Sequence, residues 1–129
     1  MVSIDLHHQH LQRRWALERQ ALEQRRLELL VAAEEAARAL RERWPALRGV
    51  WVFGSVLDPA AFRRHSDLDL VVDGLPASAQ LEALGLVEGV VDQVLANAGQ
   101  GGIAIDLARH EDLPPHWQDR LRRQALVLT

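Results

Sequence analysis

The chain has 129 residues, 48% hydrophobic and 26% charged, which are proportions typical of a soluble globular protein with a single domain. The absence of cysteine excludes disulfides, thiolate nucleophiles and cysteine-based zinc sites, and the absence of lysine excludes a Schiff base and a phosphate-loop lysine. The net charge of −3 argues against direct nucleic-acid binding, and no apolar run reaches the roughly 20 residues that cross a membrane, so we expect a cytoplasmic protein.

The N-terminal third of the chain is predicted to be one long helix. Residues 5–43 contain no glycine or proline and consist mostly of good helix formers, and Pro45 ends the segment. Apolar residues form one stripe along it, comprising Leu11, Trp15, Leu22, Leu29, Ala33, Ala36 and Leu40. A helix of this length would reach about 55 Å, beyond the diameter of a domain of this size, so it must bend, break or project.

We therefore divide the chain into an N-terminal helical extension, residues 1–44, and a domain, residues 45–129. A projecting amphipathic helix needs a second apolar surface, so the extension is expected to contact a helical partner or a second copy in a homo-oligomer. Three histidines stand at its start, His7, His8 and His10, and we favour an exposed helix end over a native metal site for them.

Short strands and helices are predicted to alternate after Pro45. In chain order the pattern indicates a strand over 50–53, a loop with one short helical turn over 56–66, a strand over 68–72, a helix over 79–97 with Ser78 as its N-cap, a strand over 103–107, a helix over 115–124 and a terminal strand or tail over 126–128. This order predicts an α/β (α+β) domain.

The chemistry is predicted to lie in the segment that runs from the end of the first of these strands to the start of the second. Gly54 and Ser55 end the first strand, and Asp67 and Asp69 begin the second, so two carboxylates point to the same face of a strand. Two like charges at that separation repel, which favours a bound cation, and hard oxygen ligands favour Mg²⁺ or Mn²⁺. A glycine after a strand lets a phosphate approach the backbone, and Asp106 places a third acid in an apolar frame on a later strand.

These residues resemble the nucleotidyltransferase superfamily related to DNA polymerase β, whose pattern is Gly-Ser, about ten residues, then Asp-x-Asp flanked by apolar residues. Gly54-Ser55, the eleven-residue spacer and Asp67-Leu68-Asp69-Leu70 match that pattern in order. The similarity is greatest to the smallest members, the minimal nucleotidyltransferases (MNT type), and covers residues 46–129. It implies a mixed sheet flanked by helices, in addition to the long N-terminal helix.

The resemblance also implies roles for single residues. Asp67, Asp69 and Asp106 would be the catalytic carboxylates and would bind two Mg²⁺ ions, with Asp106 as general base, while Gly54 and Ser55 would hold the phosphates of an NTP. The reaction would move NMP, AMP from ATP being the favoured case, to a hydroxyl. In the minimal group the usual acceptor is a partner HEPN-type RNase toxin, which the nucleotidyltransferase silences as its antitoxin.

The spacer departs from the family pattern, because its arginines stand only at its far end. Arg64 is accordingly either a nucleotide contact or a solvated residue, as is its neighbour Arg63, and Ser66 either joins the nucleotide site or only holds the turn. Two other functions stay open at this point: a small-molecule transferase of the antibiotic-modifying type, and a non-catalytic module that binds a partner through the long helix. The sequence does not identify the acceptor, the NTP or the oligomeric state.

Overall fold

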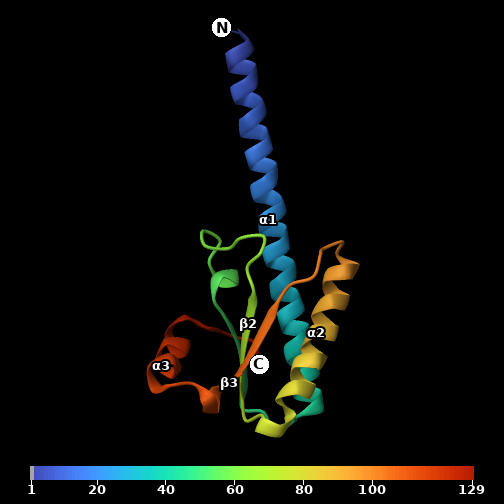
Figure 1. Ribbon diagram of the computed structural model, residues 1–129, viewed down its shortest axis with the longest axis vertical. Helices are drawn as coiled ribbons and strands as arrows, with labels where there is room; N and C mark the ends of the chain where they lie inside the picture. Colours follow the sequence, from blue (N-terminus) through green and yellow to red (C-terminus); the bar gives the residue numbers. More distant parts are fainter. Residues whose placement is uncertain (1) are drawn as a thin grey trace.

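The protein folds as a mixed four-stranded sheet with helices on both faces, in a computed structural model that describes residues 2–129 (Figure 1). Its elements are α1 (Val2–Arg43), β1 (Gly49–Phe53), β2 (Leu68–Asp73), α2 (Gln80–Asn97), β3 (Ile105–Arg109), α3 (Pro115–Gln124) and β4 (Leu126–Val127). The strand order is β3-β2-β1-β4, with β2 and β3 parallel and the other two pairings antiparallel. The expected fold class and the long N-terminal helix are therefore confirmed.

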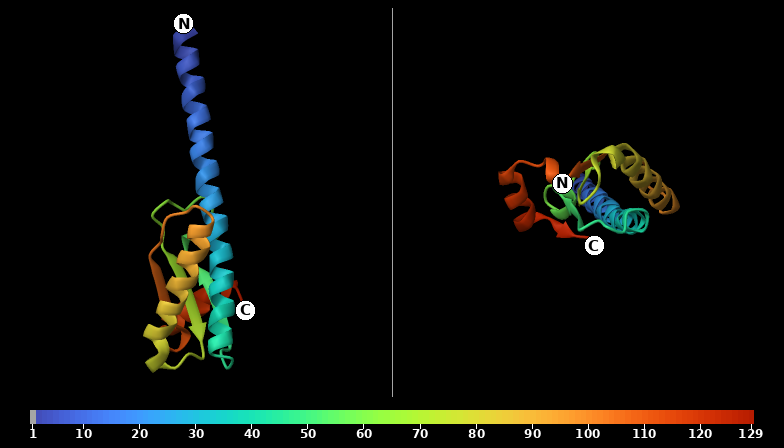
Figure 2. Two further views of the ribbon diagram at one scale, coloured as in Figure 1. Left: turned by 90° about the vertical axis from the view of Figure 1, so that its right-hand side faces the viewer. Right: turned by 90° about the horizontal axis from the view of Figure 1, so that it is seen from below.

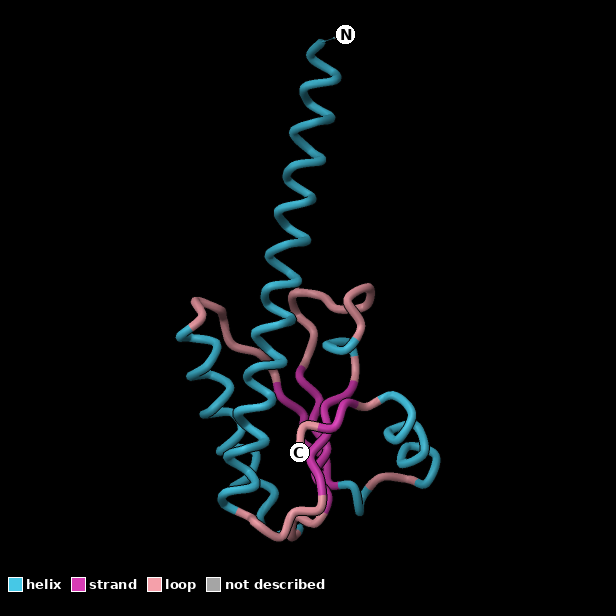
Figure 3. The backbone as a smooth tube through the Cα atoms, turned by 180° about the vertical axis from the view of Figure 1, so that it is seen from behind, coloured by secondary structure: helices cyan, strands magenta, loops and turns pink. Residues whose placement is uncertain are grey.

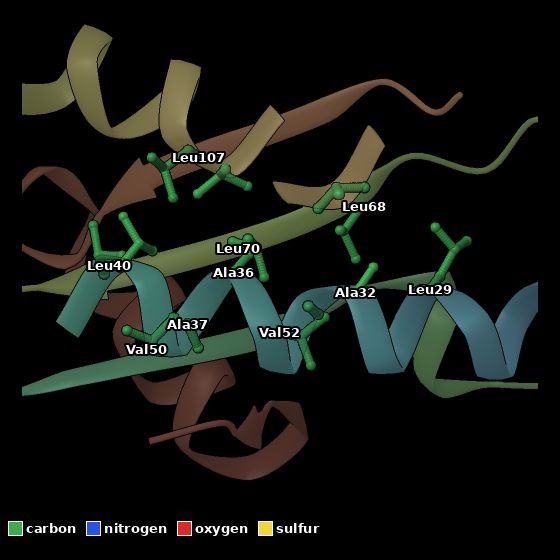
Figure 4. Close-up of a cluster of buried hydrophobic side chains, with 14 of the residues drawn as sticks. Leu29, Ala32, Ala36, Ala37, Leu40, Val50, Val52, Leu68, Leu70 and Leu107 are labelled. Atoms are coloured by element: carbon green, nitrogen blue, oxygen red, sulfur yellow. The ribbon is translucent and has the colours of Figure 1, made fainter. Parts of the chain in front are cut away.

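The core lies between the sheet and the pair α1 and α2. Alternate residues of β1 and β2, such as Val52 and Leu70, point to this side and are fully buried. The second half of α1 supplies Leu29, Ala36 and Leu40 to the same cluster, which confirms the apolar stripe in this part of the helix (Figure 4). Small residues on that face of α1 let the helix approach the strands and α2 closely.

The first half of α1 projects beyond the domain as a straight, uncovered arm (Figure 2). At 42 residues the helix is about 63 Å long. Of the three expected outcomes for such a helix, namely that it bends, breaks or projects, the structure shows that it projects. Residues 12–21 are all exposed, and Trp15 and Leu17 expose 54% and 65% of their surface. None of the described helices combines the length and apolarity required to cross a membrane.

Helix α3 lies against the other face of the sheet (Figure 3). Pro115 occupies the first turn of the helix, where its missing N–H costs nothing, so the predicted start is confirmed. The indole of Trp117 packs edge-on against Phe53 of β1, with ring centroids 6.1 Å apart. Phe53 belongs to the residues of β1 that point away from α1 and α2, so α3 covers the sheet face on which the predicted carboxylates lie.

Two local predictions were wrong. Strand β3 begins at Ile105, two residues later than expected, because the chain at Ala104 only accepts a hydrogen bond from Leu68 N–H before the parallel pairing starts. Ser78 does not cap α2: it lies inside a 3-10 turn (Ala77–Ala79), and Ala79 precedes the helix without a side-chain cap. Gly85 and Gly89 do not split α2, since both lie on its exposed side.

Candidate active site

Three carboxylates gather at one end of the sheet. Asp69 and Asp106 are paired in the parallel register of β2 and β3, so their side chains stand next to each other on the same face. Asp67 immediately precedes β2, two residues before Asp69, while Leu68 and Leu70 turn into the core. The structure therefore places these three acids at the same end of the sheet, although their ligand atoms do not all lie within 4.8 Å of one another, and their catalytic and metal-binding roles stay predictions.

The cluster carries negative charge that the protein does not neutralise. Among the described residues, no ion pair or side-chain hydrogen bond involves Asp67, Asp69 or Asp106. Burial raises the pKa of Asp69, and the neighbouring charges of Asp106 and Asp67 raise that pKa further. Clustered hard oxygen ligands without a protein cation fit a divalent ion such as Mg²⁺.

Gly54 lies directly beside this cluster, next to the carboxylate of Asp69. Its φ of +89° is a conformation that residues with a side chain rarely adopt, and a Cβ built on it would lie only 2.5 Å from Oδ2 of Asp69. Ser55 follows it and opens a 3-10 turn (Ser55–Leu57). The missing side chain leaves the Asp69 carboxylate room beside an accessible backbone, which is what a phosphate-binding turn requires.

A hollow of about 680 Å³, which we call the α3 hollow, opens beside Gly54 and Ser55. Its opposite wall comes from α3, with Trp117, Arg120 and Gln124. The Arg120 guanidinium lies over the Trp117 indole, 4.7 Å from the ring centroid, and donates from Nε to Oε1 of Gln124. The sequence analysis missed these residues of α3, because nothing local to a Pro-initiated helix indicates which turn it will face.

A second hollow, of about 960 Å³, lies between the arm and the carboxylates, and we call it the α1 hollow. Asp67, Ser66 and Arg64 line it together with residues of α1 and the loop 99–104. Arg64 and Ser66 thus lie in a different hollow from Gly54 and Ser55. The Ser66 hydroxyl accepts a hydrogen bond from Arg63 N–H, which holds the turn before Asp67. The nucleotide-binding roles of Arg64 and Ser66 stay predictions.

Two adjacent arginines of α1 fix the loops on either side of the carboxylates. Arg25 donates to the carbonyl oxygens of Gly101 and Gly102, both at 2.9 Å, and so holds the loop that leads into β3. Arg26 donates to the carbonyl of Val56, at 3.0 Å, in the turn that follows Gly54. The long helix therefore also holds the loops on both sides of the carboxylates in position.

Another group of possible metal ligands lies at the far end of the sheet. Ligand atoms of Asp73, His110 and Glu111 lie within 4.8 Å of one another. Arg48 pairs with Asp73 and Glu111, and Arg109 pairs with Glu111, so arginines of the protein already neutralise the charge of these carboxylates. Partial burial alone would raise the pKa of Asp73. Hydrogen bonds outweigh this effect, the one from Arg48 most of all, so the pKa of Asp73 is lowered. This group is better described as a structural ion-pair network.

Comparisons with known proteins agree with the fold. No family model matches the sequence, and no curated protein matches it significantly. A solved structure described as a candidate minimal nucleotidyltransferase is 29% identical, with a TM-score of 0.54 over 78% of this chain and 93% of that one. A chain from a toxin–antitoxin structure with AMP-PNP is 20% identical, with a TM-score of 0.50 over 71% of this chain and 68% of that one. The toxin–antitoxin pair MntA-HepT, at 16% identity and a TM-score of 0.49 over 78% of this chain and 71% of that one, is too distant to add to this.

The fold is similar to that of nucleotidyltransferases, and the similarity at 29% identity is to the minimal type. The comparisons support an enzyme of this class. The similarity extends over 78% of this chain and 93% of the minimal nucleotidyltransferase structure.

Proposed function

We propose that the protein transfers NMP from an NTP, AMP from ATP being the favoured case, to a hydroxyl group with release of pyrophosphate. The observation that carries the proposal is the register that places Asp106 beside Asp69, next to a Gly54 whose side chain must be absent. The one group of described residues whose ligand atoms all lie within 4.8 Å of one another, Asp73, His110 and Glu111, is already paired with arginines, whereas Asp67, Asp69 and Asp106 have no such partners.

The residues of the site would divide metal binding, proton transfer and phosphate binding among them. Asp67 and Asp69 would hold two Mg²⁺ ions, for which Mn²⁺ could substitute, and Asp106 would hold one of them. When bound, the ions neutralise phosphate charge and polarise the phosphoryl group. Asp106 accepts the proton of the acceptor hydroxyl, whose oxygen bonds to the α-phosphorus as the bond to the β-phosphate oxygen breaks. Gly54 and Ser55 hold the leaving phosphates through backbone N–H and hydroxyl groups.

We further propose that the acceptor is a partner protein, with a HEPN-type RNase toxin as the favoured candidate and this chain as its cytoplasmic antitoxin. A toxin–antitoxin structure with AMP-PNP shares the fold, which supports a nucleotide substrate and a toxin partner. The α1 hollow adjoins Asp67 and is bordered by the arm, so a protein bound along the arm would reach the carboxylates. Exposed Trp15 supplies the apolar contact for that partner, as proposed for the extension 1–44.

A partner is a better occupant of the arm than a second copy of the chain. The face that continues the core stripe upward carries Leu11, Trp15, Glu18, Leu22 and Arg25 at the alternating spacing of a helix-pairing seam. Two of these five positions are charged, and Arg25 is already bonded to the loop 99–104. Such a seam is poorly suited to self-association through α1.

The decisive experiment is intact-mass spectrometry of candidate acceptor proteins, a HEPN-type RNase first among them, after incubation with the full-length protein, ATP and Mg²⁺. We expect a gain of one or more AMP units, and no gain with Asp69→Asn, which keeps the fold. The variant Asp92→Asn is the matched control, because Asp92 is an exposed acid of α2 outside the carboxylate cluster. Transfer by Asp69→Asn at the wild-type rate would refute the assignment. Association with the RNase without any transfer would favour the non-catalytic binding module.

A further inference from the structure

Phosphate sites commonly include an arginine beside the metal ions and backbone donors, and the spacer does not supply one here. The Arg63 guanidinium donates from Nη1 to the carbonyl oxygens of Ala60 and Phe62, both at 2.9 Å, which holds it against its own turn, and Arg63 does not line the α3 hollow. Arg64 lines the α1 hollow and not the α3 hollow next to Gly54 and Ser55. Neither arginine of the spacer is placed to meet phosphates held at Gly54 and Ser55.

Arg120 lies in the α3 hollow, on the wall that faces Gly54 and Ser55. Its guanidinium has no carboxylate partner among the described residues, whereas Arg48, Arg109 and Arg123 of the same domain form ion pairs. Its one side-chain hydrogen bond leaves from Nε to Gln124, so the donors at both Nη atoms remain available. A guanidinium with free donors in a hollow is the arrangement that binds phosphate oxygens.

The guanidinium is also held in place before any ligand arrives. The guanidinium stacks on the Trp117 ring, and its Nε donates to Gln124, so two side chains of α3 hold it at the edge of the hollow that it lines. Trp117 is itself positioned by its edge-on contact with Phe53, the residue paired with Asp69 across β1 and β2. A continuous row of contacts thus joins the carboxylate cluster to Arg120.

The remaining chemistry of the hollow is compatible with an NTP. Its volume of about 680 Å³ lies within the range of small-molecule and cofactor sites. Asp58 is the other ionisable residue on its walls, and one of its carboxylate oxygens accepts a hydrogen bond from Ala60 N–H. Arg120 is therefore the one positive side chain lining this hollow.

We propose that Arg120 is the phosphate-contacting cation of this enzyme, with Trp117 and Gln124 as positioning residues that hold its guanidinium toward Gly54 and Ser55. The inference rests on the proposed nucleotidyltransferase function and names the residue that binds the substrate phosphates. In this proposal the arginine that contacts the phosphates comes from helix α3 and not from the spacer. The ligand class is the triphosphate portion of an NTP, whatever its base.

The test compares the binding of Mg-ATP, Mg-tripolyphosphate and adenosine to the full chain by isothermal titration calorimetry. Removal of a charge-assisted contact costs about 1.5–3 kcal/mol, so Arg120→Gln should weaken Mg-ATP and Mg-tripolyphosphate by about 10- to 100-fold and leave adenosine unchanged. Arg120→Lys should restore part of the loss. Trp117→Leu should weaken both phosphate ligands by a smaller factor, because the charge remains but its support is lost.

Arg122→Gln is the matched control, since Arg122 is an exposed arginine of the same helix that does not line the hollow. It should bind Mg-ATP and Mg-tripolyphosphate as the wild type does. Equal losses in Arg120→Gln and Arg122→Gln would mean a general effect of net charge and would overturn the inference, as would wild-type affinity in Arg120→Gln. In both cases wild-type binding of Mg-ATP would leave the proposed function standing. A wild-type protein that binds neither phosphate ligand would overturn both.

Discussion

Gly54 and Asp69 fit against each other so closely that a single added carbon would collide: a Cβ on Gly54 would lie 2.5 Å from Oδ2 of Asp69. The contact joins the end of β1 to the start of β2, the two places where the sequence pattern put phosphate binding and metal binding. The glycine is therefore required twice, once by its φ of +89° and once by the carboxylate beside it.

Gly54→Ala is expected to abolish nucleotide transfer while leaving the protein folded. The new methyl group must displace the Asp69 carboxylate, and the residue is strained at positive φ, at a cost of about 1–3 kcal/mol in the free energy of unfolding. The intact-mass assay of AMP transfer and thermal unfolding would measure the two effects. Gly89→Ala is the control, since a Cβ there meets nothing within 4 Å in α2 and should stabilise the protein by about 0.5–1 kcal/mol. Normal transfer by Gly54→Ala would disprove the proposed role of the turn.

Asp69→Asn is expected to make the metal-free protein more stable at neutral pH. The folded-state pKa of Asp69 is raised above its unfolded value, so the folded chain binds this proton more strongly than the unfolded chain does. Stability then falls as pH rises through the window between the unfolded and the folded pKa. The gain should be at most about 1 kcal/mol, since solvent screens a partly exposed carboxylate, and it should vanish below the unfolded pKa of about 3.9.

Urea unfolding between pH 3 and pH 7, without divalent ions, measures this difference. Adding Mg²⁺ should then stabilise the wild type, by about 2.7 kcal/mol at 100 times its dissociation constant, and should not stabilise Asp69→Asn. A wild-type protein that is more stable than the variant at pH 7 in the absence of metal would contradict the electrostatic account of the cluster.

Leu29 and Trp15 lie on the same stripe of α1 but should respond to substitution in opposite ways. Leu29 is fully buried, so Leu29→Ala should cost about 2–5 kcal/mol in the free energy of unfolding. Trp15 is 54% exposed, so Trp15→Ala should change stability little and weaken binding of the acceptor protein by about 2 kcal/mol, or about 30-fold.

Leu17→Ala is the control for the arm, because Leu17 is also exposed but two helix positions from Trp15 and therefore points away from it. Surface plasmon resonance with the RNase that gains AMP would measure the three affinities. Equal affinities for wild type and Trp15→Ala would show that the arm serves another purpose.

Arg25→Ala should loosen the approach to Asp106 without removing any residue of the site. Two hydrogen bonds to the carbonyls of Gly101 and Gly102 would be lost, at a cost of about 1–3 kcal/mol in stability. Hydrogen exchange should accelerate in residues 99–104, and Mg-ATP affinity should fall by a smaller factor than in Asp69→Asn. Unchanged exchange in this loop would mean that Arg25 is not its anchor.

Much of the fold followed from local pattern. A run of 39 residues without glycine or proline can only be helical in a chain of this composition, and the β-branched runs around Val52 and Val71 indicate strands because they suit a pleated, buried surface. The positions of Gly54, Asp67 and Asp69 were also readable, since they lie within one strand–turn–strand unit whose spacing is fixed along the chain.

The tertiary structure alone decided how distant pieces meet. The pairing of Asp106 with Asp69, the side of the sheet on which Arg120 stands, and the residue at which α1 leaves the domain all depend on packing between elements far apart in sequence. Helical and strand periods reveal which face of an element is apolar, but not what covers that face. Which element covers an apolar face depends on how the whole core packs. The stripe on α1 therefore has a single sequence pattern but two environments, since it is buried from Leu29 onward and exposed at Trp15.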